Sequence, residues 1–450
     1  MARLKLIIEY GFYLFVFLLP WQTRLIWRDS YLNGYVWEYG RFSLYGTEIL
    51  FWLVIFCYLL WLVGNKKLSP LSLSQLGSQL KSPQVVIYWL VVLLAVWAGL
   101  GVVWSLSSQL AYYRWIVLLE AVAVIAVVLN LNFSTKRLAA VWLSAASIQS
   151  VMAVWQFGQQ LVWANKWLGM ATQFPNQPGS IILQTTSERW LRAYGSLPHP
   201  NILAGWLVIA LMFLFYLAFT VQTKSWRIFI LTNLVLIVPA LFFTFSRSAW
   251  IGLIVALVLL GFWLRRCWDN NAKKIFYQLI FLMLIILTLL SLVFKDLLLT
   301  RLTGAQQLEA NSIELRLAFT QQARELIAND WLTGTGIGNY TLGVFQQLNA
   351  TWPGYYYQPV HNIYLLVVSE LGLIGGMIFA AIIAGWCWLV VRQQRSALNL
   401  EKVIIGLNFL IILIISLFDH YFWSLYFGLV VFWLILAFNL KLYSTGLNES

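Results

Sequence analysis

Residues 201–221 read NILAGWLVIALMFLFYLAFTV and contain no charged side chain. As a helix, such a run crosses the ~30 Å hydrocarbon core of a bilayer, because each residue rises about 1.5 Å. Similar apolar runs recur along the 450-residue chain. The sequence therefore predicts an all-α, polytopic transmembrane helical bundle with about twelve helices. The predicted spans are residues 4–20, 44–63, 85–104, 112–130, 138–158, 201–221, 228–245, 249–264, 275–294, 361–391, 403–418 and 421–440.

The overall composition agrees with a protein that is solvated by lipid. Hydrophobic residues make up 61% of the chain and charged residues only 10%, and the mean hydropathy is +0.78. A soluble domain carries roughly 25% charged residues. The net charge of +13 would suggest nucleic acid as a partner of a soluble protein. Here the basic residues lie in short clusters between apolar runs, so residues 1–450 are predicted to form one integral membrane domain that binds membrane lipid and no nucleic acid.

The distribution of charge predicts the topology. With a cytoplasmic N-terminus, every inner connection carries at least one Lys or Arg, as the positive-inside rule requires. The same assignment puts the C-terminus in the cytoplasm and creates two large outer loops, at residues 162–200 and 295–360. Within the second loop, apolar positions of Glu309–Asp330 recur at helical spacing, which predicts an amphipathic helix at the membrane surface. Gly372, Gly375 and Gly376 predict a kinked or tilted helix within residues 361–391.

Arginine and lysine are divided unequally between the two sides. The outer segments carry ten Arg and two Lys, whereas the inner segments carry seven Arg and ten Lys. Topology needs only positive charge, but recognition of phosphate oxygens by a planar group favours Arg. The bias suggests phosphate binding on the outer side. The alternative is that long loops simply contain Arg often.

All three histidines, His199, His361 and His420, fall on the outer side in this topology. Histidine is the side chain best suited to take a proton near neutral pH. Taken singly, each histidine could equally be a hydrogen-bonded residue at the membrane interface. No possible metal ligands occur at a close spacing such as i and i+4 on one helix, so neither a metal nor another cofactor is predicted.

Two charged residues lie close to or within apolar runs. Arg247, in Ser246-Arg247-Ser248, sits between two runs with almost no loop, and such a guanidinium is costly unless it finds a partner or water. A polar cavity would satisfy it, although the side chain could also extend to the interface. Glu120 falls within residues 112–130, where a carboxylate is a functional candidate unless it is protonated or paired.

Several motifs together resemble the O-antigen ligase and polymerase superfamily. His361-Asn362, followed by nine residues and then Gly372-Leu-Ile-Gly375, is similar to the signature of that family. The stretch from Ser246 to Trp250 (SRSAW) resembles its arginine motif. Two further segments resemble blocks of that family. One is Arg192–Asn201, which leads into a predicted helix, and the other is Trp331–Asn339 (WLTGTGIGN), whose glycines indicate a tight turn. The matches cover about residues 192–376.

The resemblance implies a membrane glycosyltransferase of the GT-C type in the bacterial inner membrane, with an extracytoplasmic active site. Its donor would be a glycan on undecaprenyl or another polyprenyl diphosphate, and its acceptor a hydroxyl of a lipid-linked sugar such as lipopolysaccharide core, of a second glycan, or of a protein. The reaction would be metal-independent and inverting. His361 would be the base or would orient the acceptor, while Arg192, Arg247 and Arg316 would bind the diphosphate. The candidate supporting residues are His199, Asn362, Ser246 and Glu120.

Other functions remain open at this stage. Within the superfamily, the chain could be a surface polysaccharide polymerase or a protein O-oligosaccharyltransferase. A transporter or flippase for a lipid-linked sugar is an alternative from another class. Transporters, however, place polar groups near the middle of the bilayer and often contain internal repeats. In this chain the polar residues gather at predicted helix ends and in outer loops, which favours the enzyme.

Overall fold

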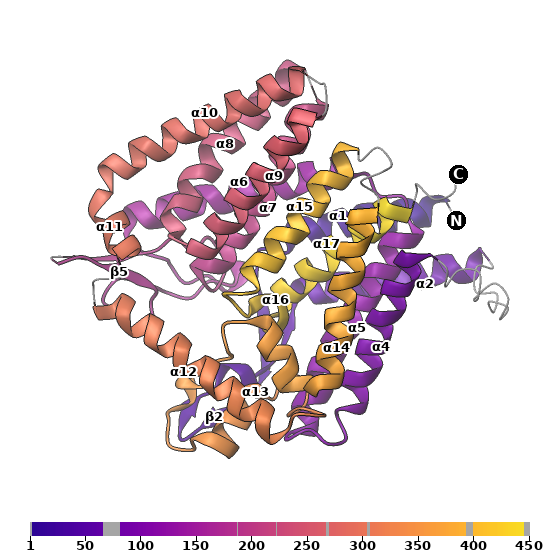
Figure 1. Ribbon diagram of the computed structural model, residues 1–450, viewed down its shortest axis with the longest axis vertical. Helices are drawn as coiled ribbons and strands as arrows, with labels where there is room; N and C mark the ends of the chain where they lie inside the picture. Colours follow the sequence, from indigo (N-terminus) through magenta and orange to yellow (C-terminus); the bar gives the residue numbers. More distant parts are fainter. Residues whose placement is uncertain are drawn as a thin grey trace.

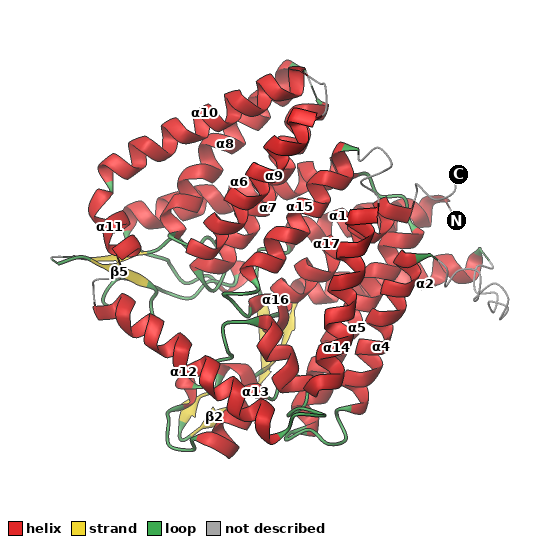
Figure 2. Cartoon of the chain, viewed as in Figure 1, coloured by secondary structure: helices red, strands yellow, loops and turns green. Residues whose placement is uncertain are grey.

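The computed structural model describes residues 2–65, 82–186, 188–221, 223–266, 270–303, 307–392 and 399–444, and it forms a helical bundle with three short β-hairpins in these ranges (Figures 1 and 2). A helix is present at each of the predicted spans, which confirms the all-α membrane architecture. These helices are α1 (Ala2–Leu18), α2 (Gly46–Gly64), α4 (Pro83–Leu100), α5 (Ser108–Asn130), α6 (Thr135–Gln159), α7 (Pro200–Thr220), α8 (Lys224–Thr244), α9 (Arg247–Arg266), α10 (Asn270–Val293), α14 (Ile363–Arg392), α15 (Leu400–Ile415) and α17 (Tyr426–Ser444).

Ten of the described helices are long and apolar enough to cross a membrane. The two that fall short are α1, with 17 residues, and α15, with 16 residues. Four of the basic residues that the predicted topology puts on the cytoplasmic side lie outside the described ranges: Lys66, Lys67, Lys81 and Arg395.

The centre of the bundle is formed by α7 and α17. Every residue of α7 from Pro200 to Ala218 is buried, because α6, α8, α9 and α15 pack around it. The second central helix, α17, packs against α5 and α15. By contrast, α10 is mostly exposed and presents apolar side chains such as Phe281 and Leu289. A fully apolar central helix and an apolar exterior are what a bundle solvated by lipid requires.

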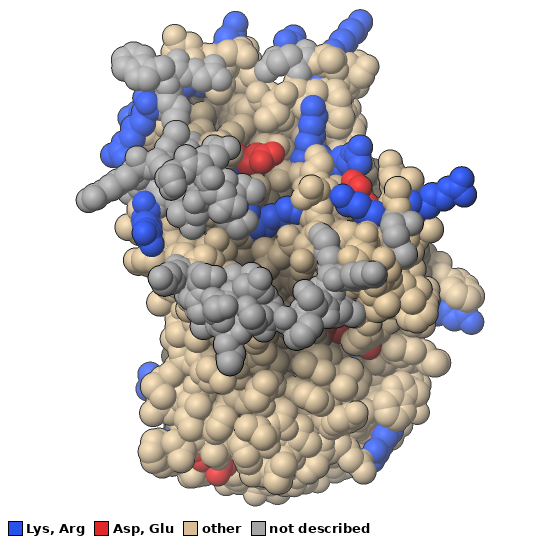
Figure 3. All heavy atoms as spheres, turned by 90° about the vertical axis from the view of Figure 1, so that its right-hand side faces the viewer, with Lys and Arg blue, Asp and Glu red and all other residues tan. Residues whose placement is uncertain are grey.

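Charge is scarce over much of the molecular surface. On the face shown in Figure 3, Lys and Arg side chains gather in the upper half, and a broad area below them carries few charged groups. Such an area would be a liability in water and suits contact with lipid.

Shorter elements lie between the long helices and build the loops. The hairpins pair β1 (Arg24–Arg28) with β4 (Phe42–Tyr45), β2 (Tyr31–Leu32) with β3 (Tyr35–Val36), and β5 (Ile182–Gln184) with β6 (Arg189–Leu191). The remaining elements are η1 (Glu38–Gly40), η2 (Lys166–Leu168), α11 (Lys295–Thr303), α12 (Gln307–Asn329), α13 (Tyr340–Gly343), η3 (Val344–Leu348), η4 (Gly354–Tyr356) and α16 (Tyr421–Ser424).

The predicted amphipathic helix is α12. Its Leu317 is 67% exposed, whereas Phe319, Ala323 and Leu326 are buried against the rest of the molecule. In Figure 1, α12 lies at the lower left of the view, and it packs against the long helix α14. The helix predicted for Glu309–Asp330 is therefore present as α12, with one face inward and one outward, while its place at the membrane surface stays a prediction.

The predicted kink in α14 is at Gly372, whose φ of 67° is left-handed. The turn at residues 331–339 docks onto this kink, where the N–H of Leu373 donates to the carbonyl of Trp331 at 2.8 Å and that of Gly336 donates to the carbonyl of Glu370 at 2.8 Å. A β-carbon at position 372 would clash with the carbonyl of Leu332. Glycine is thus required both by the backbone angle and by the close approach of two chain segments.

Candidate functional site

Two histidines and a carboxylate form the histidine cluster, which consists of His361, Asp419 and His420. His361 is followed by Asn362 and then by Ile363, the first residue of α14. The other two residues lie between α15 and α16. One nitrogen or oxygen atom from each residue lies within 4.8 Å of the others. The two imidazole rings meet edge to face, with centroids 5.0 Å apart. On its other side, the ring of His361 stacks parallel to Phe319 of α12, at 5.9 Å.

Asn362 explains the place of His361. Its Oδ1 accepts a hydrogen bond from the N–H of Leu365 at 3.0 Å, which caps the first turn of α14. Its Nδ2 donates to the carbonyl of Leu417 at 3.2 Å, and the N–H of Ile363 donates to the carbonyl of Ser416 at 2.9 Å. These bonds fasten the start of α14 to the segment that ends in Asp419 and His420, so the His-Asn motif assembles the cluster.

The surroundings of His361 favour its neutral form. Burial lowers the pKa of His361 below its ordinary value, Asp419 offsets part of this effect, and Arg316 adds to it. Burial also lowers the pKa of His420 well below its ordinary value, with further contributions from His361, His199 and Arg316. A neutral imidazole has a free nitrogen lone pair, so His361 is able to accept a proton near pH 7.

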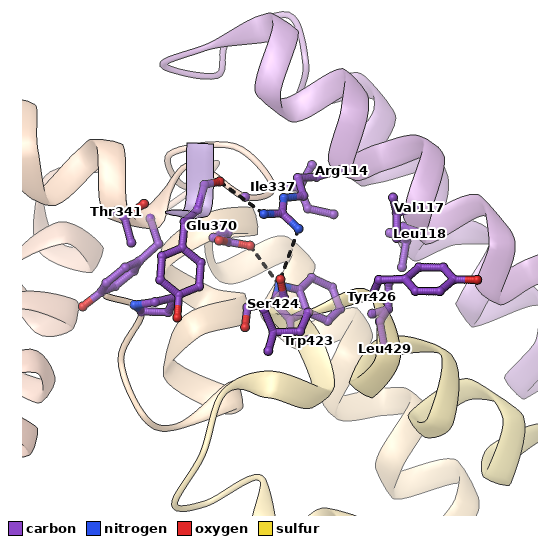
Figure 4. A pocket seen from close by; sticks show the side chains of 15 residues that line it. Arg114, Val117, Leu118, Ile337, Thr341, Glu370, Trp423, Ser424, Tyr426 and Leu429 are labelled. Carbon is purple, nitrogen blue, oxygen red and sulfur yellow. Dashed lines mark hydrogen bonds between the residues drawn. The ribbon is translucent and has the colours of Figure 1, made fainter. Parts of the chain in front are cut away.

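A small cavity is lined by residues that contact the histidine cluster (Figure 4). The guanidinium of Arg114 donates to the carbonyl of Ser424 at 3.1 Å and to that of Tyr39 at 3.2 Å. The hydroxyl of Ser424 lies 2.6 Å from Nδ1 of His420, and the ring of Tyr39 meets the ring of His420 edge to face. The cavity has a volume of about 30 Å³, enough for about one water molecule. The contacts of Ser424 and Tyr39 with His420 therefore hold this histidine in place.

A second cavity, the arginine cavity, is lined by Arg247, Arg301 and Arg316 and has a volume of about 290 Å³. The other lining residues are neutral: Asn201, Ser246, Ser248, Ile251 and Phe418. Ser246, Arg247 and Ser248 stand at the start of α9, where the helix dipole and free backbone N–H groups favour an anion. Three guanidinium groups with no carboxylate in the lining thus create a strongly positive pocket.

The wall of the arginine cavity is built on the junction of α8 and α9. Phe245 connects these helices with a φ of 47°, a left-handed conformation that is unusual for a bulky residue. Nε of Arg301 donates to the carbonyl of Phe245 at 2.9 Å, and Nε of Arg192 donates to that of Thr244 at 2.6 Å. The two guanidinium groups satisfy carbonyls at the end of α8 and so hold this sharp connection.

A chain of hydrogen bonds links this junction to the histidine cluster. Nη2 of Arg192 donates to Oδ1 of Asn201 at 2.7 Å, and Nδ2 of Asn201 donates to Oδ2 of Asp419 at 2.8 Å. Asn201 lines the arginine cavity, while Asp419 lines the larger cavity described next. The hydrogen bond between them therefore crosses the wall that separates two cavities.

The larger cavity, here called the tyrosine cavity, has a volume of about 590 Å³. Its walls come from the segments around β1 to β4, residues 162–199, residues 354–361 and residues 419–427. His199 and all three members of the histidine cluster contribute to its lining. Its tyrosines are Tyr39, Tyr45, Tyr194, Tyr355, Tyr357 and Tyr421. His361 thus faces a roomy, largely uncharged chamber adjacent to the positive pocket.

The structure brings most of the predicted site residues together. His199 and His361 line the tyrosine cavity, Ser246, Arg247 and Arg316 line the arginine cavity, and Asn362 holds His361 in place. Arg192 is only 4% exposed and lines neither cavity, because its guanidinium is turned into the wall. Glu120 lies elsewhere, within α5, where it accepts a hydrogen bond from Trp52 at 2.9 Å.

Two members of this arrangement, Asp419 and Arg301, were not identified from the sequence, and His420 was considered only as one of the three outer histidines. Asp419 and His420 follow an apolar run directly, and a polar pair at that position was the available signal. Arg301 belongs to the arginine-rich outer set, but nothing in its local sequence separates it from the other members. Their proximity to His361 or Arg247 is a product of tertiary structure.

The histidine cluster shows an arrangement that spacing within one helix could not reveal. The sequence lacks closely spaced metal ligands, and the fold gathers His361, Asp419 and His420 into a group that could hold a metal ion. These side chains come from two segments that are far apart in the chain. The same three groups can equally act as a base with a carboxylate and a second imidazole beside it.

The fold and the two cavities define a polytopic membrane protein with a polar site at helix ends. A family comparison adds that residues 232–380 match the model of the O-antigen ligase family. This match covers about a third of the chain and includes Arg247, Arg301, Arg316 and His361. It confirms the predicted resemblance to the O-antigen ligase superfamily and supports an O-antigen ligase or polymerase type of function in general. A search of curated proteins found no match.

Proposed function

We propose that this protein is a membrane glycosyltransferase that moves a glycan from a polyprenyl diphosphate to an acceptor hydroxyl. The observation that carries the proposal is the position of a half-buried imidazole, whose pKa its surroundings lower, beside a pocket lined by three arginines. The reaction needs a base for a poor nucleophile and charge stabilisation for an anionic leaving group, and these two features supply both.

The arginine cavity would bind the diphosphate. As the bond between the anomeric carbon and the diphosphate oxygen breaks, its electron pair stays on the leaving diphosphate. Arg247, Arg301 and Arg316, together with the N-terminus of α9, would stabilise that growing negative charge. Because the guanidinium groups of Arg247 and Arg301 already contact backbone carbonyls, these two groups need little reorganisation during the reaction.

His361 would act as the general base. A sugar hydroxyl becomes a competent nucleophile when its proton is drawn away, and a positioned imidazole contributes roughly 10²–10⁴-fold to such a step. The hydroxyl proton moves to His361 while the oxygen forms the new bond to the anomeric carbon. Asp419, within 4.8 Å, would stabilise the imidazolium that results. One direct displacement of this kind inverts the anomeric centre and requires no metal.

The remaining predicted residues would take supporting roles. Arg192 and Asn201 would position Asp419 from behind the wall, while Asn362 would position His361. Ser246 would contribute its backbone at the start of α9 to the anion site. Glu120 does not line either cavity and would serve the packing of α2 against α5 through Trp52.

Purified protein in lipid nanodiscs, supplied with a polyprenyl-diphosphate glycan and a glycolipid extract of the source cell envelope, tests the proposal. The expected result is glycan transfer with release of the polyprenyl diphosphate. Arg316→Ala should lose most of this activity, whereas Arg324→Ala, an exposed residue on the same helix, should retain it. In sealed proteoliposomes, movement of intact donor across the bilayer without its cleavage would reject the enzyme and favour a flippase.

The side of the membrane is tested separately. The proposal puts both cavities on the extracytoplasmic side, in agreement with the distribution of basic residues. A cysteine introduced at the exposed position Tyr355, in a background in which the native cysteines are replaced by Ser, should react with an impermeant thiol reagent added to intact cells. Reaction only after the cytoplasmic side is opened would contradict this orientation.

A further inference from the structure

The tyrosine cavity differs in its chemistry from every other pocket described above. Its only Arg, Arg24, forms an ion pair with Glu38 at 2.6 Å, and Asp419 is the remaining charged group in the lining. With neutral histidines, the chamber therefore has no excess positive charge. A phosphate group would gain little there, so the occupant is expected to be uncharged.

The lining favours a polyhydroxylated ligand. Besides the six tyrosines, three glutamines contribute amide groups that can both donate and accept: Gln22, Gln173 and Gln358. Aromatic rings provide apolar faces for the C–H surfaces of a sugar ring, while hydroxyl and amide groups match its alternating donors and acceptors. The volume of about 590 Å³ is typical of pockets that enclose a small organic molecule.

His199 provides a donor with a fixed direction in this chamber. Its Nδ1 accepts a hydrogen bond from the N–H of Asn201 at 3.0 Å, as the N-cap of α7. Nδ1 therefore carries no proton, and the neutral ring carries its proton on Nε2. Burial lowers the pKa of His199 well below its ordinary value, and Arg192 and His361 add to this effect. Among the described residues, Nε2 has no hydrogen-bond partner, and the ring lines the cavity.

We infer that the tyrosine cavity binds the acceptor as a neutral carbohydrate, and that His199 donates a hydrogen bond from Nε2 to one of its oxygens. The inference rests on the proposed function and deepens it, since it selects a sugar hydroxyl over a protein side chain as the acceptor. His361 lines the same chamber, so a bound sugar can present a hydroxyl to it. His199 is then a specificity-determining residue, which contacts the substrate and takes no proton.

Two conservative substitutions separate this role from helix capping. In His199→Asn, the side-chain oxygen replaces Nδ1 and still caps α7, but the donor at Nε2 is lost. In His199→Gln, the amide nitrogen replaces Nε2 as a donor, but the cap is lost. The inference predicts that His199→Asn raises KM for the envelope glycolipid extract about tenfold and leaves KM for the donor unchanged. His199→Gln should keep KM for the extract near its wild-type value.

The opposite pattern, with full rescue by Asn and not by Gln, would show a capping role alone and overturn the inference. A change confined to KM for the donor, or efficient transfer to delipidated protein, would also overturn it. Binding provides a readout that does not depend on turnover. Neutral oligosaccharides released from the same extract should give saturation-transfer NMR signals with wild type and Arg247→Ala, and weaker signals with His199→Asn. If wild type binds these sugars but releases no polyprenyl diphosphate, then the proposed function fails and the sugar site stands.

Discussion

The two cavities beside the histidine cluster have opposite chemistry. The arginine cavity is small and carries three positive charges, whereas the tyrosine cavity has about twice its volume and is nearly neutral. They are separated by a wall that the hydrogen bond from Asn201 to Asp419 crosses. The difference suggests a division of labour, in which one side stabilises a departing anion and the other admits a neutral nucleophile.

The largest expected effect comes from removing the proposed general base. His361→Ala should lower kcat by about 10²–10⁴-fold, because the proposal assigns the acceptor proton to this imidazole in the tyrosine cavity. The assay is release of polyprenyl diphosphate in nanodiscs. The variant should show the same thermal unfolding midpoint as wild type. Activity within tenfold of wild type, in a properly folded variant, would contradict the role of His361 as the base.

The charge of the arginine cavity is tested by Arg316→Ala. Loss of one preorganised donor at a developing anion typically costs about 10²–10³-fold in rate, and this loss should appear in kcat/KM for the donor. KM for the acceptor should stay unchanged, which would confirm that the two cavities act on different substrates. Arg324→Ala provides the control for loss of charge on the same helix. Equal losses in both variants would mean that only general electrostatics is involved.

The wall between the cavities is tested by Asp419→Asn. Transfer requires neutral His361, so activity falls as the pH drops through the pKa of His361. In wild type this pKa already lies below the ordinary value of 6.5, and Asp419 raises it in part. The substitution removes that contribution, so the acid limb of the pH–rate profile should move to lower pH. The plateau rate should fall by about tenfold, because the imidazole becomes a weaker base. An acid limb that moves to higher pH would refute the assignment.

The smallest effect is expected from a chelator. If His361 acts as a base, with Asp419 and His420 beside it and no bound metal, then EDTA should change the rate by less than about twofold. Loss of activity that an added divalent cation restores would instead assign His361, Asp419 and His420 as metal ligands. That result would also explain the grouping of three ligand atoms in one place.

The sequence predicted the fold better than it predicted the site. The spans followed directly from long apolar runs, and the kink at Gly372 and the amphipathic α12 followed from glycine and from periodicity. Those features depend on local sequence, which is visible without a structure. The motif residues His361 and Arg247 were identified through resemblance, and the fold does direct them to adjacent cavities.

The rest required three-dimensional information. Nothing local distinguishes Arg192, which satisfies a helix carbonyl within a wall, from Arg301, which also reaches a cavity. Likewise, the role proposed for Asp419 depends on its contacts with Asn201 and His361, which are both distant in sequence. For Glu120, no partner could be predicted from the sequence, because Trp52 comes from another helix.

The helix α12 has a further consequence. Arg316 and Phe319 lie one turn apart on it, so one residue reaches the anion pocket while the other supports the ring of His361. A movement of α12 at Arg316 would therefore also move Phe319, which stacks on the ring of His361. Under the proposed function, a diphosphate bound to Arg316 would therefore also influence the orientation of the His361 ring, which predicts that the lipid-linked donor binds before the acceptor sugar.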